Sequence, residues 1–430
     1  MDQNLQRLEE VSFDLMNIQS AIRRFIPMAL GAACAVLPVT ASHAAEQTTT
    51  PASSSANEDE SKVAPYTLPE LLKFNDGSDV KTFADWENRR RDELLITFRS
   101  EVFGFSPPKP EALSFRTVTS DPIAMEGQAT RKQVEISFQL SGQTFAFPLT
   151  LFVPNDRKSP APVFLLLNHR PAENADPTRE KRMDFWPAES LIARGYAIAA
   201  INVAADVEPD KREATTGLRT FYRQHFAHSD TLTWGALAAW SWAGSRVMDY
   251  FETDRDINTR QVAIIGHSRG GKAALWAAAQ DPRFALACVN QSGEGGAALS
   301  RRNYGETLEM ITKSCPHWFV PGYAGYAGKE ETLPIDQHEL IALIAPRGYH
   351  GGEGKLDTWS DPRGSWLSLV EASRAWALAG KIAPWVDRMP AVDQPRKDGP
   401  LAYHLRDGGH DLTAPDWKFY LDHADSLFSH

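Results

Sequence analysis

Cysteine is scarce in this chain, with three residues among 430. Cys34 lies in an apolar stretch near the amino terminus, which leaves Cys288 and Cys315 for the rest of the protein. Two cysteines can form at most one disulfide, so the fold must rest on its hydrophobic core. We expect two buried thiols, and a disulfide between them is the alternative in an oxidising compartment.

Long runs of positive charge are also missing from the interior of the sequence. Lys and Arg number 45 against 55 Asp and Glu, which gives a formal net charge of −10. Nucleic-acid binding needs clustered Lys and Arg to meet the phosphates, so this balance argues against a nucleic-acid partner. An acidic balance is common in soluble enzymes, so it argues against a class of partner without identifying the function.

No apolar run is long enough to predict a membrane span. The longest candidate, Phe25–Val39, is short for a span and contains two prolines. Arg23 and Arg24 precede it, and the small-x-small sequence Ser42-His43-Ala44 follows it. This order is typical of a cleaved secretory signal, so we expect residues 1–45 to direct export to the periplasm or the medium, without a stable membrane anchor. The alternative is an amphipathic helix at the end of a cytosolic protein.

The boundaries after this signal follow from composition. Residues 1–15 contain acidic residues that do not suit a positively charged signal start, so Met16 is an alternative translation start. Residues 46–63 are rich in Thr, Ser, Ala and acidic residues, which predicts a disordered linker. From residue 64 to 430 the composition is globular, and we expect one domain there.

The hydrophobic pattern of this domain changes along the chain. Segments with strand composition come first, at 113–118, 133–140 and 145–153. Short apolar runs then alternate with helical patterns, as in strands buried on both faces. The later predicted strands are 163–167, 196–201, 262–265, 285–289 and 403–406, and the predicted helices are 234–251, 271–280, 336–345 and 416–428. This alternation predicts a mostly parallel central sheet with helices on both faces, an α/β three-layer sandwich.

A nucleophile motif stands between one of these strands and the following helix. Gly266-His267-Ser268-Arg269-Gly270 fits the pattern G-x-S-x-G, with the apolar run Val262–Ile265 before it and an Ala-rich helix after it. In the α/β-hydrolase fold this pattern forms a strained strand-to-helix turn that lifts the serine hydroxyl clear of the sheet. Backbone N–H groups at the start of the helix can bind a developing oxyanion. This context favours Ser268 as a nucleophile over an ordinary Gly-Ser turn.

The serine needs a base, and in this fold the chain order is serine, acid, histidine. His410 lies in Asp407-Gly408-Gly409-His410-Asp411, in the loop after the last predicted strand, where the base is expected. Five other histidines fit this place less well. His267 lies in the motif itself, and His317 and His338 come too early in the chain to follow the last strand. His423 and His430 lie in or beyond the final helix. We therefore predict His410 as the base.

The acid that orients the histidine is less well determined. Asp357 follows a predicted helix and a short strand candidate at 347–351, which is the usual place of the acid. Asp361 and Glu353 are close rivals. In a purely structural interpretation, Asp361 belongs to a turn with the proline after it, and Asp357 caps a helix.

A series of short motifs extends around these residues from about Asn168 to Trp417. They are Gly266–Lys272, Ser292–Gly296, Gly305–Thr307, His317–Phe319, Leu333–His338, Ala345–Arg347 and Asp357-x-Trp359. Together they resemble the bacterial glucuronoyl esterases, carbohydrate esterase family fifteen. Ordinary lipases lack the S-R-x-G-K motif with a downstream G-E and D-x-W, so the resemblance is specific.

The resemblance implies an activity and roles for further residues. Enzymes of this family cleave the ester between 4-O-methylglucuronic acid on xylan and lignin alcohols, without a metal, and no cofactor is implied. Arg269 matches the residue that helps to hold the oxyanion, as a guanidinium can. Lys272, Glu306 and Trp359 match positions that bind the hydroxyls of the uronic acid. Without the resemblance, Lys272 and Glu306 would be interpreted as a solvated helix face and Trp359 as a core aromatic.

One position departs from the family pattern. Many members carry the triad acid as Glu directly before the S-G-x-G-G segment, where this chain has Gln291. A glutamine cannot carry the negative charge, so the prediction moves to Asp357, an acid position used in part of the family. Glu294 is a weaker substitute. A second interpretation is an impaired triad in a slow or inactive relative.

The sequence thus predicts a serine esterase on glucuronoxylan or lignin–carbohydrate esters, which we expect to act as a monomer. Another carbohydrate esterase, such as an acetyl xylan esterase, is the alternative among enzymes. A non-catalytic sugar-binding protein is the alternative from another class, and the presence of both Ser268 and His410 argues against it.

Overall fold

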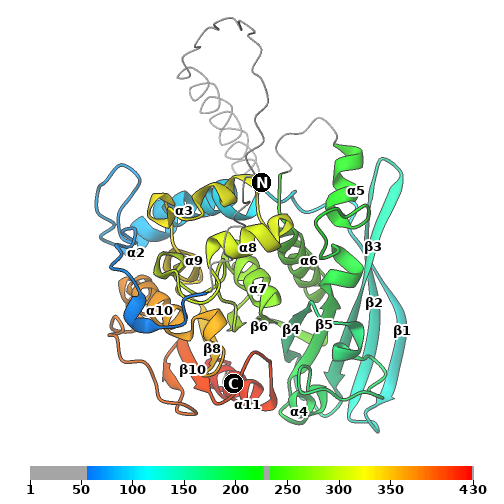
Figure 1. Ribbon diagram of the computed structural model, residues 1–430. Helices are drawn as coiled ribbons and strands as arrows, with labels where there is room; N and C mark the ends of the chain where they lie inside the picture. Colours follow the sequence, from blue (N-terminus) through cyan, green and yellow to red (C-terminus); the bar gives the residue numbers. More distant parts are fainter. Residues whose placement is uncertain (1–55, 227–232, 429–430) are drawn as a thin grey trace, which may run out of the picture. The chain divides into compact units, whose positions relative to one another are not determined.

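The centre of the structure is a sheet whose middle strands are buried on both faces. The computed structural model describes residues 56–226 and 233–428 (Figure 1). Strand β4, Ala161–Asn168, is buried along its whole length. Successive side chains of a strand point to opposite faces, and here Val163, Leu165 and Leu167 join one apolar core whereas Phe164 and Leu166 join the other. The continuous apolar run in the sequence therefore reflects helices on both faces of the sheet.

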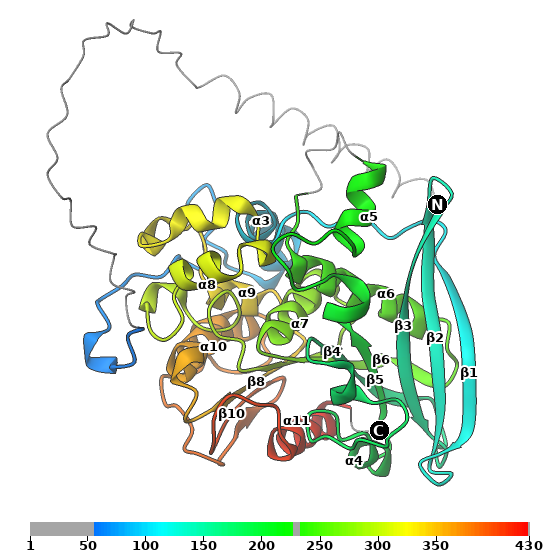
Figure 2. The same ribbon diagram turned by 45° about the vertical axis from the view of Figure 1, so that its right-hand side comes forward.

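The ten strands found in the described residues form one sheet in the order β1-β2-β3-β5-β4-β6-β7-β8-β10-β9. The middle strands, from β5 to β10 in this order, pair in parallel. β1, β2 and β3 extend one side as an antiparallel ribbon, visible at the right of Figures 1 and 2, and β9 closes the other side. Besides β4, the strands are β1 Ser114–Ala124, β2 Ala129–Leu140, β3 Gln143–Pro154, β5 Ala197–Asn202, β6 Ile257–His267, β7 Leu286–Asn290, β8 Gly348–Gly354, β9 Arg396–Asp398 and β10 Leu401–Arg406.

The helices divide between the two cores. Those on the side of Val163 are α3 Arg91–Phe98, α5 Leu218–His225, α6 Ala236–Phe251, α7 Arg269–Gln280, α8 Leu308–Ser314, α9 Gln337–Ala342 and α10 Pro362–Leu378. Those on the side of Phe164 are α4 Ala188–Ala193 and α11 Ala414–Leu427. The short α2 Phe83–Asp85 leads into the α3 region. The predicted three-layer α/β fold is confirmed.

The predicted elements correspond to strands β1 to β8 and β10 and to helices α6, α7, α9 and α11. The hydrophobic pattern did not predict α3, α5 or α10, although α10 is a long helix. The 347–351 strand candidate is the start of β8. Cys288 lies buried in β7 and Cys315 is partly buried, and both are free thiols, as expected.

The amino-terminal predictions fall largely outside the described residues. The signal region 1–45 and residues 46–55 are not described. Residues 56–63 are described, and they contact two loops of the domain. The Asn57 carbonyl accepts a hydrogen bond from the Gly305 N–H at 2.8 Å, and the Glu58 carboxylate accepts one from the Thr358 hydroxyl at 2.6 Å. Polar groups in residues 56–63 thus have partners in the domain, and the predicted linker 46–63 as a whole stays a prediction. In the described ranges, no helix has the length and apolar character needed to cross a membrane.

Candidate active site

Ser268 occupies a strained turn between β6 and α7. Its backbone has φ 54° and ψ −128°, which is unfavourable for a residue with a side chain. The turn is closed so tightly that a Cβ on Gly266 would lie 2.0 Å from the Gly270 carbonyl oxygen. The glycine of the motif is thus needed for the close backbone approach in this turn. Ser268 is partly exposed and directly follows the last residue of β6.

The start of α7 offers hydrogen-bond donors beside Ser268. Arg269 is the first residue of the helix, whose first-turn N–H groups have no partner within the helix. The Arg269 Nε is buried and has no hydrogen-bond partner. A buried donor without a partner is costly, and an incoming oxygen atom would satisfy it. This part of the site can therefore accept a developing negative charge.

His410 and Asp357 are brought together from two loops. Asp357 follows β8 and His410 follows β10, and these strands are parallel neighbours. The Asp357 Oδ2 lies 2.6 Å from His410 Nδ1, within the 2.6–3.2 Å expected for an orienting acid. The Asp357 side chain is 4% exposed and that of His410 is 41% exposed. The His410 ring also lies 4.4 Å, between centroids, from His267, the residue before Ser268.

The rival acids have other partners. Glu294 accepts hydrogen bonds from the Ser300 hydroxyl at 2.7 Å and the Tyr323 hydroxyl at 3.1 Å. Asp361 binds Arg302 and caps α10 through the Gly364 N–H. Glu353 accepts a hydrogen bond from the Ser360 hydroxyl at 3.1 Å. The histidine contact predicted for the acid is made by Asp357.

Asp210, which the sequence analysis did not single out, fixes Arg269. It accepts hydrogen bonds from Arg269 Nη1 at 2.5 Å and from the Trp318 indole N–H at 2.6 Å, and His317 Nε2 lies 2.8 Å away. Burial acts to raise the pKa of Asp210, but the hydrogen bonds from His317, Trp318 and Arg269 outweigh it and hold the pKa below its ordinary value. His317 and Trp318 were noticed only as a motif, and nothing in the spacing of Asp210 from Arg269 links the two.

Lys272, Glu306 and Trp359 are linked by one side-chain contact and one backbone hydrogen bond. Lys272 Nζ donates to the Ser292 carbonyl at 2.6 Å and lies 3.9 Å from Glu306 Oε2. The Glu306 N–H donates to the Trp359 carbonyl at 2.9 Å. The two loops touch because Gly305 has no side chain: a Cβ there would lie 2.4 Å from that same carbonyl oxygen. Trp359 is 45% exposed, which is unusual for so large an apolar residue.

Lys272 is buried beside a carboxyl group. The side chain is almost fully buried, which lowers its pKa, while the neighbouring carboxyl group of Glu306 opposes this shift. A buried ammonium with one carbonyl partner at hydrogen-bond distance retains donors for a ligand. The neighbouring Glu306 carboxyl supplies acceptors, so the pair can bind adjacent hydroxyl groups.

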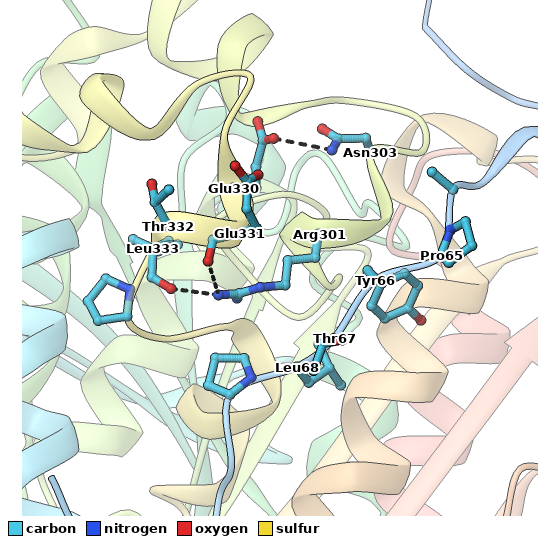
Figure 3. A pocket seen from close by; sticks show the side chains of 13 residues that line it. Pro65, Tyr66, Thr67, Leu68, Arg301, Asn303, Glu330, Glu331, Thr332 and Leu333 are labelled. Atoms are coloured by element: carbon cyan, nitrogen blue, oxygen red, sulfur yellow. Dashed lines mark hydrogen bonds between the residues drawn. The ribbon is translucent and has the colours of Figure 1, made fainter. Parts of the chain in front are cut away.

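A separate cavity of about 800 Å³ lies between residues 64–69 and 330–334 (Figure 3). Arg301 reaches into its wall, but its guanidinium already donates to the carbonyls of Glu331 and Leu333. The cavity contains none of the predicted site residues, and we do not place the active site there. No group of three or more metal-ligating side chains is placed to hold a metal in the described part of the chain.

The parallel sheet, the strained serine after β6 and the histidine and aspartate after β10 and β8 define an α/β-hydrolase. A family model described as "Glucuronyl esterase, fungi" matches residues 136–380. A curated relative, Carbohydrate esterase MZ0003 from an unknown prokaryotic organism, is 38% identical and matches 86% of this chain and 91% of its own. The 4-O-methyl-glucuronoyl methylesterase of Schizophyllum commune is 29% identical, with 73% and 74% covered.

Solved structures agree with the sequence relatives. A glucuronoyl esterase from Solibacter usitatus superposes with a TM-score of 0.80 at 37% identity and covers 85% of this chain and 99% of its own. A CE15 esterase described as promiscuous, from a marine bacterial metagenome, gives a TM-score of 0.79 at 37% identity, with 86% and 100% covered. The chain therefore belongs to the glucuronoyl esterases, carbohydrate esterase family fifteen.

Proposed function

We propose that this protein is a serine esterase that hydrolyses the ester between 4-O-methylglucuronic acid of glucuronoxylan and lignin alcohols. The observation that carries the proposal is the Asp357–His410 pair beside the strained Ser268, with Lys272 and Glu306 next to it. Relatives named 4-O-methyl-glucuronoyl methylesterases support the substrate class.

In this proposal Ser268 is the nucleophile and His410 the base. The Ser268 Oγ attacks the ester carbonyl carbon while His410 takes its proton, and Asp357 stabilises the imidazolium. Arg269 and the first N–H groups of α7 bind the oxyanion. His410 then protonates the departing alcohol, and a water molecule, deprotonated by the same histidine, releases the uronic acid and restores Ser268.

Lys272 and Glu306 are proposed to recognise the uronic acid, with Trp359 beside them. Replacing Lys272 by Met removes a charged donor, and replacing Glu306 by Gln exchanges a charged acceptor for a neutral amide, both at nearly constant volume. A hydrogen bond to a charged group is worth on the order of 1.5–3 kcal/mol. We expect kcat/KM on a benzyl glucuronate ester to fall about 10- to 100-fold. Hydrolysis of a simple aryl acetate, which has no sugar hydroxyls, should change little. Equal losses on both substrates would assign these residues a structural role.

The substrate class is tested by comparing two esters with the wild-type protein. Benzyl 4-O-methylglucuronate places the uronic acid on the acyl side, whereas an acetylated xyloside places the sugar on the alcohol side. We expect efficient release of benzyl alcohol from the first and slow release of acetate from the second. The opposite preference would favour an acetyl xylan esterase, and no turnover of either would favour a sugar-binding relative.

We also propose export of the protein and monomeric action. The amino-terminal sequence supports a cleaved signal, as argued from Arg23, Arg24 and the small residues at 42–44. Expressed from its full gene in a bacterial host, the protein should appear in the periplasmic fraction with a new terminus near Ala45 or Glu46. Amino-terminal sequencing checks this, and an uncut chain in the cytosol would contradict it.

A further inference from the structure

His410 lies in a loop that makes no strand pairing of its own. Residues 407–413 connect β10 to α11, and the His410 side chain is among the more exposed parts of the site. A base misplaced by about 1 Å can cost roughly 100-fold in rate, so the loop backbone must be fixed by other contacts.

Gln291 supplies two of these contacts. It follows β7, is 1% exposed and has φ 45°. Its Oε1 accepts the Asp411 N–H at 2.9 Å, and its Nε2 donates to the Gly409 carbonyl at 3.3 Å. These are the two residues that flank His410. An amide has both the acceptor and the donor that this arrangement uses, whereas a carboxylate has no donor for the carbonyl.

Arg406 holds the same loop from the end of β10. Its guanidinium donates to the carbonyls of Asp407 at 3.0 Å, Gly409 at 2.8 Å and Asp411 at 2.7 Å. It is held in turn by Asp416, which accepts from Arg406 Nε at 2.7 Å. The Gly409 carbonyl thus receives hydrogen bonds from both Arg406 and Gln291.

The loop that carries Asp357 meets the His410 loop at the same place. The Leu356 N–H donates to the Gly408 carbonyl at 3.0 Å. A Cβ on Gly354 would lie 2.8 Å from Gln291 Nε2 and 2.7 Å from the Gly409 carbonyl oxygen. Gln291 is therefore packed at the junction of the two loops whose side chains form the Asp357–His410 contact.

We propose that Gln291 and Arg406 are positioning residues that fix the His410 backbone so that its ring meets Asp357 and faces Ser268. The inference rests on the proposed esterase function. Position 291 contributes through a neutral amide with a donor and an acceptor, and not as a source of negative charge.

The test compares Gln291→Met and Gln291→Glu with the wild type on benzyl glucuronate, well below the melting temperature of each protein. Gln291→Met removes both hydrogen bonds and is expected to lower kcat tenfold or more with KM changed less than twofold, because the sugar contacts are untouched. Gln291→Glu keeps the acceptor but loses the donor, and its kcat should fall below that of the wild type as well.

Gln337→Met is the matched control, since Gln337 is also a fully buried glutamine but lies in α9. It measures what the loss of a buried amide costs in melting temperature, and its kcat should remain near that of the wild type. A wild-type kcat in Gln291→Met, or a kcat that rises in Gln291→Glu, would overturn the positioning role. If Gln291→Met does not fold, Gln291→Glu alone decides. A wild type without ester hydrolysis would instead count against the proposed function.

Discussion

Replacing Ser268 by alanine is expected to abolish ester hydrolysis while the protein stays folded. The substitution removes the one oxygen that would form the acyl-enzyme, and in a serine hydrolase this costs on the order of 10⁶ in kcat. The backbone of the turn should persist, because alanine meets the same restriction as serine at φ 54°. Turnover of benzyl glucuronate and the melting temperature, measured on the same preparation, check both parts of the expectation.

A buried serine elsewhere in the fold, Ser241, provides the control. Ser241 in α6 is 1% exposed, and its hydroxyl oxygen lies 2.7 Å from both the Leu237 and the Ala273 carbonyl, to either of which it can donate. Ser241→Ala should therefore reduce stability slightly and leave turnover nearly unchanged. Near-normal turnover by a folded Ser268→Ala protein would remove Ser268 from the mechanism.

Replacing Asp357 by asparagine is expected to lower kcat by roughly 10⁴, as the same change does in the serine proteases. The asparagine would fill the same space but would not stabilise the imidazolium, and its amide group could hold His410 in the wrong tautomer. The contact at risk is the 2.6 Å pair between Asp357 Oδ2 and His410 Nδ1. Steady-state kinetics on benzyl glucuronate measures the loss.

Glu294→Gln is the matched control for this carboxyl. Burial raises the pKa of Glu294 to about 8, so the group is largely uncharged near neutral pH and an amide resembles it. Its partners, Ser300 and Tyr323, are remote from the histidine loop in sequence, and a small effect on kcat is expected. A large loss in Glu294→Gln together with an active Asp357→Asn would show that the acid was assigned wrongly.

The sequence predicts those parts of the fold whose pattern is strictly local. Val163–Leu167 and Val262–Ile265 are continuous apolar runs because both faces of these strands are covered. The nucleophile turn is equally local, since Gly266 and Ser268 are only two residues apart and the geometry needs both. α10 escaped prediction because its buried face includes small polar residues such as Ser365, Ser368 and Ser373, which do not give an apolar stripe.

The contacts that could not be predicted join segments that are far apart in the sequence. Asp210 meets Arg269 only because the loops after β5 and β6 end at the same edge of the sheet. Gln291 could be recognised in the sequence as a neutral side chain where an acid was expected, but not as a partner of the His410 loop. Residues 56–62 have the polar composition of a linker. The partners of their polar groups come from distant parts of the chain, as Arg302 does for Glu60, so the composition does not reveal them.

The account is tested most directly by a crystal structure of Ser268→Ala in complex with the methyl ester of 4-O-methylglucuronic acid. The ester carbonyl carbon should lie about 3–3.5 Å from where the Ser268 hydroxyl would be, with the carbonyl oxygen directed toward Arg269 and the start of α7. The sugar hydroxyls should contact Lys272 and Glu306, with the ring beside Trp359. A sugar bound elsewhere, for example in the cavity of Figure 3, or one whose ester points away from residue 268, would contradict the proposed site.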